Sequence, residues 1–307
     1  MTFKFGFAKE DAEAGAPSSD PEDGELGAGA AAPYEHRPGS PAGCAARARG
    51  NERFDTVAVG PQDRPVAILK GRVTGQDAAE LLGAACEASD LVAGRYEGGF
   101  KLWECSVDLA NVLCERWELA GCGGAPGLPR TPSRALAGRS VVELGCGHAV
   151  PGILALLGGA ETVVLQDFNP EVVRALVVPN CEANAARLAA EGAQLPRETR
   201  FLSGDWGQLD DLLLRGATAG GFDLVLASET VYAEAAARRF YRLLTKVLKR
   251  PGGEAYVAGK AYYFGVGGGT QAFEELVRRG GVLGCEVVWR CDDGRSNVRE
   301  VLRLWPL

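Results

Sequence analysis

The sequence has few of the residues on which several common enzyme classes depend. Among its 307 residues there are only two histidines, His36 and His148, and no Cys-x-x-Cys pair. A Ser-His-Asp hydrolase needs a well-placed histidine, and zinc sites commonly need histidines or paired cysteines. The composition therefore disfavours both classes, and we expect no metal site.

Long apolar runs and an excess of positive charge are also missing. No segment has the roughly 18 consecutive apolar residues of a membrane-spanning helix, and residues 1–7 lack the apolar stretch of a secretory signal. The net charge of −7 argues against a general nucleic-acid-binding protein, which needs a clustered basic face. The nine cysteines are an odd number without paired spacing, which is typical of free thiols in a reducing compartment. We therefore expect an intracellular protein.

The composition divides the chain into three segments. Half of residues 1–50 are Ala, Gly or Pro, so the segment can bury little apolar surface, and we predict disorder over 1–53. Residues 54–90 contain extended stretches at 54–59 and 65–69 and a helical pattern at 77–88, and we predict an extension that packs on the core. Residues 91–307 are predicted to form one catalytic domain.

From residue 140 onward, strands alternate with helices, after one helical pattern at 102–119. The predicted strands are 140–144, 162–166, 199–202, 222–227 and 254–258, followed by 285–291 and 298–305. The predicted helices are 151–157, 171–191, 233–248 and 271–279. The last two strands flank a turn of Asp, Gly and Ser, which predicts a hairpin. The pattern indicates an α/β fold with a seven-strand, Rossmann-like, doubly wound sheet and an antiparallel terminal hairpin.

The strongest local pattern is a glycine turn between a predicted strand and a predicted helix, Glu143-Leu-Gly145-Cys-Gly147. Glycine lets the backbone approach a ligand closely, and a helix N-terminus offers free N–H groups. A dinucleotide site needs G-x-G-x-x-G, but the third glycine, Gly152, comes too late here. An acid before Gly-x-Gly is instead the pattern of S-adenosylmethionine (SAM) methyltransferases. The turn therefore favours SAM over NAD, and an NAD-dependent oxidoreductase stays open as the alternative.

Acidic residues follow the next two predicted strands. A carboxylate at the position of Asp167 can accept hydrogen bonds from both ribose hydroxyls of a nucleoside, in SAM and NAD enzymes alike. Gly204-Asp205-Trp206 follows the third strand. In methyltransferases an acid at this place bonds the adenine amino group, and an aromatic neighbour covers the ring. Both stretches are therefore predicted to hold a nucleoside.

Polar residues also follow the strand at 222–227, in the string Ser228-Glu229-Thr230-Val-Tyr232. Open α/β sheets bind their ligands at this edge. The Asn/Asp-Pro-Pro-Tyr string of nucleobase amino-methyltransferases is absent here, which counts against that class. After the fifth strand, three aromatic residues at 262–264 precede a run of glycines, and this pattern indicates a mobile lip over a pocket.

Five stretches of the sequence carry one combined pattern. They are Asp90 to Cys105, which ends in Trp103-Glu104-Cys105, then Glu143 to Gly147, Gln166 to Asn169, Ser228 to Tyr232, and Lys260 to Gly269. Together they resemble the histidine protein methyltransferase 1 homologues, which are seven-strand SAM methyltransferases, from about Asp90 to the C-terminus. The sequence departs from that family at His148 and Ala149, where Ser/Thr and Gly are usual, and its residues 10–90 are shorter and richer in Ala and Pro.

The resemblance implies that SAM is the cofactor and that its methyl group is transferred to the tele nitrogen of a histidine in protein 3 of the large ribosomal subunit. It also implies a location in the cytoplasm and nucleus, including the nucleolus. We expect a monomer that binds a protein substrate and contacts neither nucleic acid nor membrane. Carried over by position, the SAM contacts are Trp103, Glu104, Cys105, Gly145, Asp167, Phe168, Asn169, Gly204, Asp205, Trp206 and Ser228, and the turn pattern adds Glu143 and Gly147.

The chemistry that this reaction asks of the enzyme is modest. A neutral imidazole, with an unperturbed pKa of about 6.5, is already a nucleophile at pH 7. The enzyme has to align one ring nitrogen with the sulfonium methyl group and accept the N–H of the other. We predict Glu229, Asn169 or Tyr232 as this acceptor, and we expect His148 only to fill the turn. A protein-lysine methyltransferase of the same fold and a non-catalytic ribosome-assembly factor stay open as alternatives.

Overall fold

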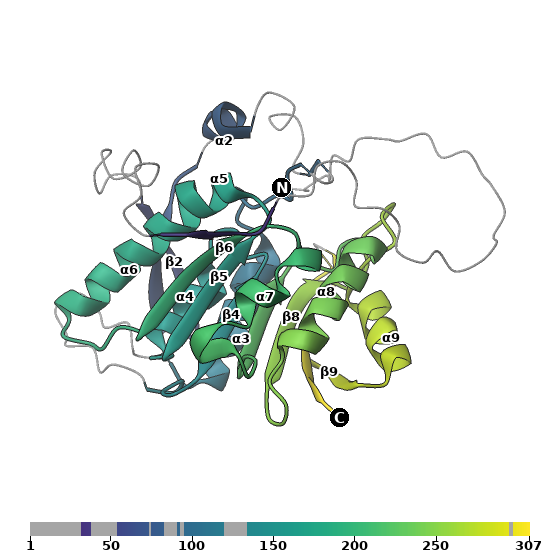
Figure 1. Ribbon diagram of the computed structural model, residues 1–307. Helices are drawn as coiled ribbons and strands as arrows, with labels where there is room; N and C mark the ends of the chain where they lie inside the picture. The colour runs from purple at the N-terminus through teal and green to yellow at the C-terminus, as the bar shows by residue number, and fades with distance from the viewer. Residues whose placement is uncertain are drawn as a thin grey trace.

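One mixed sheet of eight strands forms the centre of the molecule (Figure 1). The computed structural model describes residues 32–37, 54–73, 75–82, 91–92, 95–119, 134–294 and 297–307. The strand order is β1-β6-β5-β4-β7-β8-β10-β9. In chain order the strands are β1 (Tyr34–His36), β4 (Ser140–Leu144), β5 (Thr162–Asp167), β6 (Glu198–Ser203), β7 (Leu224–Ser228), β8 (Glu254–Lys260), β9 (Leu283–Cys291) and β10 (Arg299–Pro306).

The predicted doubly wound α/β sheet is confirmed. The five strands from β4 to β8 run parallel, and β10 lies antiparallel between β8 and β9 as the predicted terminal hairpin. The central strands are rich in Val and Leu and are buried on both faces, as parallel strands between two helical layers must be. This parallel arrangement brings the carboxyl ends of β6, β5, β4, β7 and β8 to one edge of the sheet.

Helices cover both faces of the sheet (Figure 1). Residues alternate between two cores along each strand, with Val141 and Val163 in one and Val142 and Val164 in the other. The first core is covered by α3 (Glu104–Arg116), α4 (Val150–Leu157), α5 (Pro170–Val172), the π-helical η3 (Val173–Val177) and α6 (Val178–Ala190). The second is covered by η4 (Trp206–Gln208), α7 (Asp210–Leu213), α8 (Glu234–Val247) and α9 (Thr270–Gly280), while η5 (Gly216–Thr218) is a short connector. The helix predicted at 171–191 is thus interrupted by a π-helical turn.

An antiparallel hairpin precedes the domain and packs on the same face as α3 and α6. It consists of β2 (Phe54–Val59) and β3 (Val66–Gly71) and is followed by α2 (Gly75–Leu82). Val59, Val66 and Ile68 are fully buried in the first core, so the hairpin contributes apolar surface to it. The predicted helix at 77–88 is shorter, since α2 ends at Leu82 and residues 83–90 lie outside the described residues.

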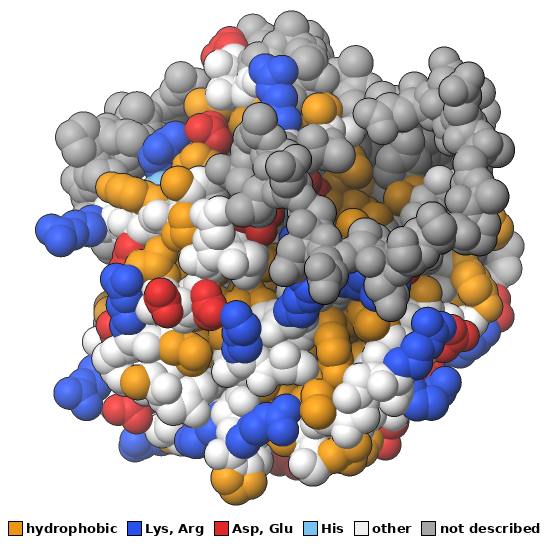
Figure 2. All heavy atoms as spheres, turned by 45° about the vertical axis from the view of Figure 1, so that its right-hand side comes forward, with side chains coloured by type: hydrophobic (Ala, Val, Ile, Leu, Met, Phe, Trp, Pro, Cys, Tyr) orange, Lys and Arg blue, Asp and Glu red, His pale blue; other side chains and the backbone are white. Residues whose placement is uncertain are grey.

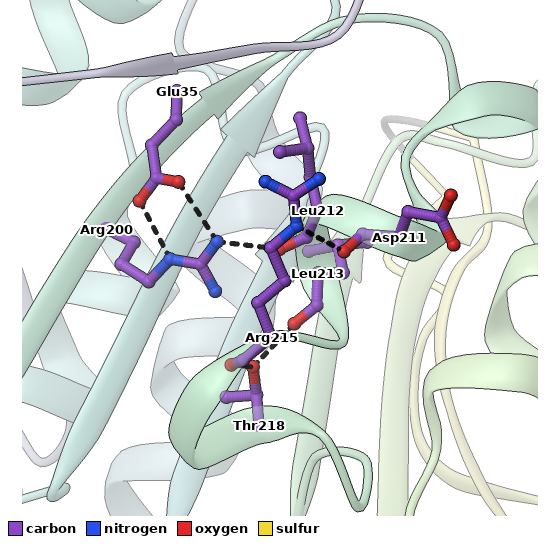
Figure 3. Close-up of polar contacts among 7 residues, drawn as sticks. All are labelled: Glu35, Arg200, Asp211, Leu212, Leu213, Arg215 and Thr218. Atoms are coloured by element: carbon purple, nitrogen blue, oxygen red, sulfur yellow. Dashed lines mark hydrogen bonds and ion pairs between the residues drawn. The ribbon is translucent and has the colours of Figure 1, made fainter.

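The strand β1 was not expected, because it lies inside the segment 1–53 for which we predicted disorder. It adds an eighth strand to the sheet by pairing antiparallel with β6, with Tyr34 opposite Ser203. The Glu35 carboxylate accepts hydrogen bonds of 2.9 and 3.2 Å from Arg200, which also donates to the Leu212 carbonyl at 2.6 Å (Figure 3). Specific polar contacts rather than apolar content hold this strand, which is why composition does not reveal it. Residues 1–31 and 38–53 lie outside the described residues.

Candidate functional site

The glycine turn predicted from the sequence connects β4 to α4. Gly145 and Gly147 have φ angles of 66° and 50°, in the left-handed region that favours glycine. A Cβ atom on Gly145 would lie 3.0 Å from Cγ2 of Thr230, and one on Gly147 would lie 3.1 Å from the carbonyl oxygen of Gly99. Both the backbone geometry and the tight packing therefore require glycine at these two positions.

Glu143 lies behind the turn and is fully buried. Its Oε2 accepts a 2.7 Å hydrogen bond from the N–H of Gly152, in the first turn of α4. Burial raises the pKa of this carboxyl well above its usual range. Among the described residues its Oε1 has no hydrogen-bond partner. The contact ties the start of α4 to β4, so Glu143 orients the turn from inside.

Asp167 ends β5 beside the turn and is 4% exposed. Its two carboxylate oxygens accept hydrogen bonds from the N–H of Gly147 at 2.9 Å and of Asn169 at 3.1 Å. Burial raises the pKa of Asp167 to about 6, so the group is still ionised at pH 7. Each oxygen of a carboxylate can accept two hydrogen bonds, and the Phe168 main chain contributes a third one to Asp167, so the carboxylate retains acceptor capacity for a hydroxyl group of a ligand.

Gln166 connects the turn with the end of β6, a contact that the sequence did not predict. Its Oε1 accepts hydrogen bonds from Trp206 Nε1 at 2.9 Å and the Gly145 N–H at 3.3 Å, and its Nε2 donates to the carbonyl of Gly204 at 3.0 Å. Asp205 caps η4 by accepting a 2.8 Å hydrogen bond from the N–H of Gly207. The structure therefore brings together the glycine turn and the predicted nucleoside residues at adjacent strand ends.

Glu229 follows β7 and has a φ angle of 55°, which is unusual for a residue with a side chain. Its Oε2 accepts a short hydrogen bond from the hydroxyl of Tyr263. Its Oε1 is buried and, among the described residues, without a partner, as is the hydroxyl of the neighbouring Thr230. The site thus contains two buried polar atoms, on consecutive residues, that have no partner among the described residues.

Two neutral hydrogen-bonding groups lie beside Glu229, and the buried Lys260 lies near them, with its Nζ 5.5 Å from the centroid of the Tyr263 ring. Burial and the charge of Glu229 raise the pKa of the Tyr263 hydroxyl well above its usual value, so that hydroxyl remains a donor. Burial, the same charge and a hydrogen bond with Glu229 also raise the pKa of the Cys105 thiol, which stays protonated. Neither neighbour can act as an anion near neutral pH, and the Glu229 carboxylate is the acceptor of this cluster.

A second Glu–Tyr pair faces the first. The Tyr232 hydroxyl donates a short hydrogen bond to Glu97, and the rings of Tyr232 and Tyr263 meet edge to face with centroids 6.5 Å apart. The Asn169 amide accepts from the Glu97 N–H at 3.2 Å and donates to the Arg95 carbonyl at 2.7 Å. Both ends of the Asn169 amide therefore bind the backbone of this loop, which makes Asn169 a support for Glu97.

The other residues predicted to contact SAM differ in their burial and in their hydrogen-bond partners. Trp103 precedes α3 and donates from Nε1 to the Gly98 carbonyl at 3.0 Å. Glu104 is exposed and lies 3.6 Å from Arg299, so its carboxylate is engaged in an ion pair on the side of β10. Ser228 is buried at the end of β7, and Phe168 is half-buried after β5.

Sequence reasoning assigned no individual role to the site residues Gln166, Glu97 and Thr230, and it expected Tyr263 only in a lip over a pocket. All four lie inside or beside the stretches that carried the family resemblance. Their positions in those strings were the available signal. Their contacts include the hydrogen bonds Trp206–Gln166 and Tyr232–Glu97, which join residues 40 and 135 positions apart, and no local pattern shows which partners will meet.

The face of the molecule shown in Figure 2 carries charges of both signs. On the face shown in Figure 2, acidic and basic side chains are interspersed among the described residues. The described part of the chain contains no cluster of His, Cys, Asp or Glu suited to a metal ion. None of its helices has the length and apolar character needed to cross a bilayer.

Comparison with known proteins agrees with this arrangement. The sequence profile of a family described as lysine methyltransferase matches residues 93–262. Histidine protein methyltransferase 1 homolog of Dictyostelium discoideum is 39% identical over 71% of this chain and 61% of its own length. The homolog of Rattus norvegicus is 33% identical over 67% of this chain and 56% of its own. Histidine protein methyltransferase 1 of Schizosaccharomyces pombe is 33% identical over 62% of this chain and 60% of its own length. The chain therefore spans somewhat more than half the length of these relatives.

Proposed function

This chain belongs to the methyltransferase family described as lysine methyltransferase, and we propose that it transfers a methyl group from SAM to a histidine side chain of a protein. The relatives named as histidine protein methyltransferases support the choice of acceptor. The observation that carries the proposal is the buried Oε1 of Glu229, which has no partner among the described residues and lies at the carboxyl edge of the sheet. An imidazole N–H is the kind of donor that this oxygen needs.

The residues at the strand ends fit SAM, whose bound form supplies an electrophilic methyl group. The left-handed turn at Gly145 and Gly147 offers close backbone approach for the methionine part, and the remaining acceptor capacity of Asp167 suits a ribose hydroxyl. Asp205 and Trp206 would receive the adenine. The predicted SAM contacts are completed by Trp103, Cys105, Phe168, Gly204 and Ser228. Glu143 and Asn169 support these residues. The ion pair with Arg299 argues for a structural role of Glu104.

The reaction needs an oriented, neutral imidazole. Glu229 Oε1 would accept the N–H of the pros nitrogen, which fixes the tautomer whose tele nitrogen carries the lone pair. Tyr263 holds the other carboxylate oxygen, so the free oxygen keeps its direction. The attacking nitrogen must approach the methyl carbon at about 3–3.5 Å, in line with the bond that breaks. Once the methyl group is transferred, the positive charge is on the imidazole, beside the Glu229 carboxylate.

The identity of the substrate rests on the family resemblance. We propose protein 3 of the large ribosomal subunit as the acceptor, with the enzyme acting as a monomer in the cytoplasm and nucleus, including the nucleolus. The interspersed charges of the visible face fit a protein partner better than a bare phosphate backbone, which selects a continuous basic stripe.

The first prediction concerns the product. The full chain is incubated with methyl-labelled SAM and proteins of the large ribosomal subunit, and the acceptor is then hydrolysed for amino-acid analysis. We expect label in tele-methylhistidine, and none when Asp167→Ala replaces the unchanged enzyme. Label in pros-methylhistidine would contradict the assigned orientation. Binding of ribosomal protein without any transfer would instead indicate an assembly factor.

A protein-lysine methyltransferase is the second candidate, and the description of the family favours it. Two carboxylates and two tyrosine rings surround the acceptor position, and such groups also suit an ammonium ion. The same hydrolysate separates the two candidates, because methyllysine without methylhistidine would replace the histidine proposal by this one.

A further inference from the structure

The hairpin β2–β3 has a free edge that a helix covers with polar side chains. In an antiparallel pair, every second residue of β3 turns its N–H and C=O groups away from β2, and an uncovered edge of this kind invites unwanted pairing. The outward groups of β3 belong to Ala67, Leu69 and Gly71. Asn180, Asn184 and Arg187 of α6 lie opposite them.

The three side chains form a ladder along the free edge of β3. The Gly71 N–H donates to Asn180 Oδ1 at 2.6 Å. Asn184 accepts from the Leu69 N–H at 3.0 Å and donates to the Leu69 carbonyl at 2.8 Å, as a neighbouring strand would. Arg187 donates to the carbonyl of Ala67. Residues spaced by four and three share one helix face, so this face of α6 takes the place of a third strand.

Asn180 differs from the other two because it also contacts the glycine turn. Its Nδ2 donates a 3.0 Å hydrogen bond to the main-chain carbonyl of His148, the residue after Gly147. Asn180 is fully buried, and its amide bridges the hairpin on one side and the turn on the other. Accepting the Gly71 N–H polarises the amide and strengthens its donation to His148, since linked hydrogen bonds reinforce one another.

His148 is itself fixed from its other side. Its Nε2 lies 3.0 Å from the Phe100 carbonyl, and burial lowers the pKa of the ring to about 4, so the ring is neutral at pH 7. Its Nδ1 has no partner among the described residues. Two contacts therefore hold His148 just before α4. The Asn180 amide donates to its main-chain carbonyl, and its ring contacts the Phe100 carbonyl. A shift of His148 would move Gly147, whose N–H is bonded to Asp167.

We infer that Asn180 is a positioning residue through which the N-terminal hairpin sets the shape of the glycine turn and thereby the affinity for SAM. The inference rests on the cofactor part of the proposed function and is independent of which amino acid is methylated. It assigns the hairpin a part in cofactor binding, although no residue of the hairpin is placed in contact with the cofactor.

The test compares Asn180→Asp with Asn184→Asp in the full chain. Both substitutions keep a side-chain oxygen for the β3 N–H and remove a donor from the same helix face, but only the first removes the contact to His148. SAM affinity is measured by calorimetric titration without an acceptor protein, and stability by thermal denaturation. We expect N180D to raise the Kd for SAM about 5- to 10-fold, the effect of one hydrogen bond. N184D should change it less than 2-fold, with similar losses in Tm.

Equal changes of Kd in the two variants, or an unchanged Kd in N180D, would overturn the inference. Amide hydrogen exchange gives a second readout that needs no SAM and also serves for Asn180→Ala if N180D does not fold. We expect faster exchange at residues 147–150 in the Asn180 variants and not in N184D. Protection that persists in the Asn180 variants would overturn the inference on its own. An unchanged chain that failed to bind SAM would instead contradict the proposed function.

Discussion

At the scale of single residues, the Glu229–Tyr263 pair determines what the site can recognise. The tyrosine hydroxyl occupies one carboxylate oxygen and leaves the other buried and without a partner among the described residues. A buried acceptor without a donor is costly, so a ligand that supplies an N–H gains the free energy of satisfying it. The pair therefore favours an imidazole that presents its N–H to Oε1.

Replacing Glu229 by Gln should slow the chemical step. Tyr263 is a hydroxyl donor, so it should hold the amide oxygen of the new side chain and turn the NH₂ group toward the substrate. An NH₂ group cannot accept the imidazole N–H, and the productive tautomer loses its support. We expect the single-turnover rate to fall about 100-fold, in the range typical of lost acid–base assistance, with the Kd for SAM nearly unchanged. Rapid-quench measurement with labelled SAM tests this.

The matched control is Glu254→Gln, because Glu254 makes the same kind of contact at the opposite end of β8. There the Tyr256 hydroxyl donates to Glu254 at 2.8 Å, and Arg303 pairs with the same carboxylate. This variant should lose some stability and retain the single-turnover rate. If E229Q and E254Q proved equally active, Glu229 would have no part in the reaction.

At the scale of elements, β1 shows how a short strand is held by polar contacts. Arg200 is 7% exposed, and removal of Glu35 would leave its buried guanidinium without a carboxylate. His36 adds a 2.8 Å hydrogen bond between Nε2 and the Ser203 hydroxyl. Ser203 directly precedes Gly204, which was predicted to contact SAM. The strand therefore supports the end of β6 at which the adenine residues begin.

Docking of β1 should depend on pH through His36. Burial, with the charge of Arg174, lowers the pKa of His36 to about 4, against about 6.5 in the unfolded chain. Between these values the unfolded chain binds more protons, so the stability that the neutral ring contributes is present above about pH 6.5 and lost as the pH falls toward 4. We expect the difference in unfolding free energy between the unchanged chain and His36→Gln to shrink by about 2–3 kcal/mol across this window.

Denaturant titrations at several pH values measure this difference. Tyr34→Phe is the control in the same strand, because Tyr34 is exposed and its replacement introduces no group that titrates below pH 7. Its unfolding free energy should run parallel to that of the unchanged chain. A parallel curve for His36→Gln as well would show that His36 does not titrate with folding.

At the scale of the whole molecule, local patterns predicted the sheet, and long-range contacts decided its edges. Strand–helix alternation from residue 140 gave all seven predicted strands, because apolar runs and glycine turns are local signals. The strand β1 was not predicted, because the residues that hold it, Arg200 and Ser203, lie more than 160 positions away in the sequence. The π-helical turn η3 was also not predicted, because the sequence of Val173 to Val177 is compatible with a regular α-helix.

Some residues of the candidate site could likewise be predicted from local patterns, and others could not. Gly145, Gly147, Asp167 and the stretch 204–206 were predicted from their places after strands, and the parallel sheet brings these positions to one edge. The roles of Gln166 and Asn180 could not be predicted, because each depends on a backbone partner from another element. The residues predicted to face a ligand thus follow from local patterns, while the residues that support them follow from packing.

Because residues from five strands and the linked hairpin meet at one edge, cofactor binding should stabilise the entire domain. A ligand that binds only the folded chain raises the unfolding free energy by about 2.7 kcal/mol at 100 times its Kd. For a domain of this size that corresponds to an increase in Tm of roughly 5–11 °C. We expect this increase with SAM in thermal denaturation and none with NAD. The chain has no third glycine at the spacing after Gly147 that a dinucleotide site needs.

Asp167→Ala should abolish the increase, because it removes the proposed acceptor for the ribose and the partner of the Gly147 N–H. Asp223→Asn is the matched control at the amino end of the sheet. Asp223 also accepts a main-chain hydrogen bond, from the Ser140 N–H at 2.9 Å, and pairs with Lys249. D223N should melt at a lower temperature and still respond fully to SAM. A full response in D167A would instead remove Asp167 from the cofactor site and leave the glycine turn to bind SAM through its backbone alone.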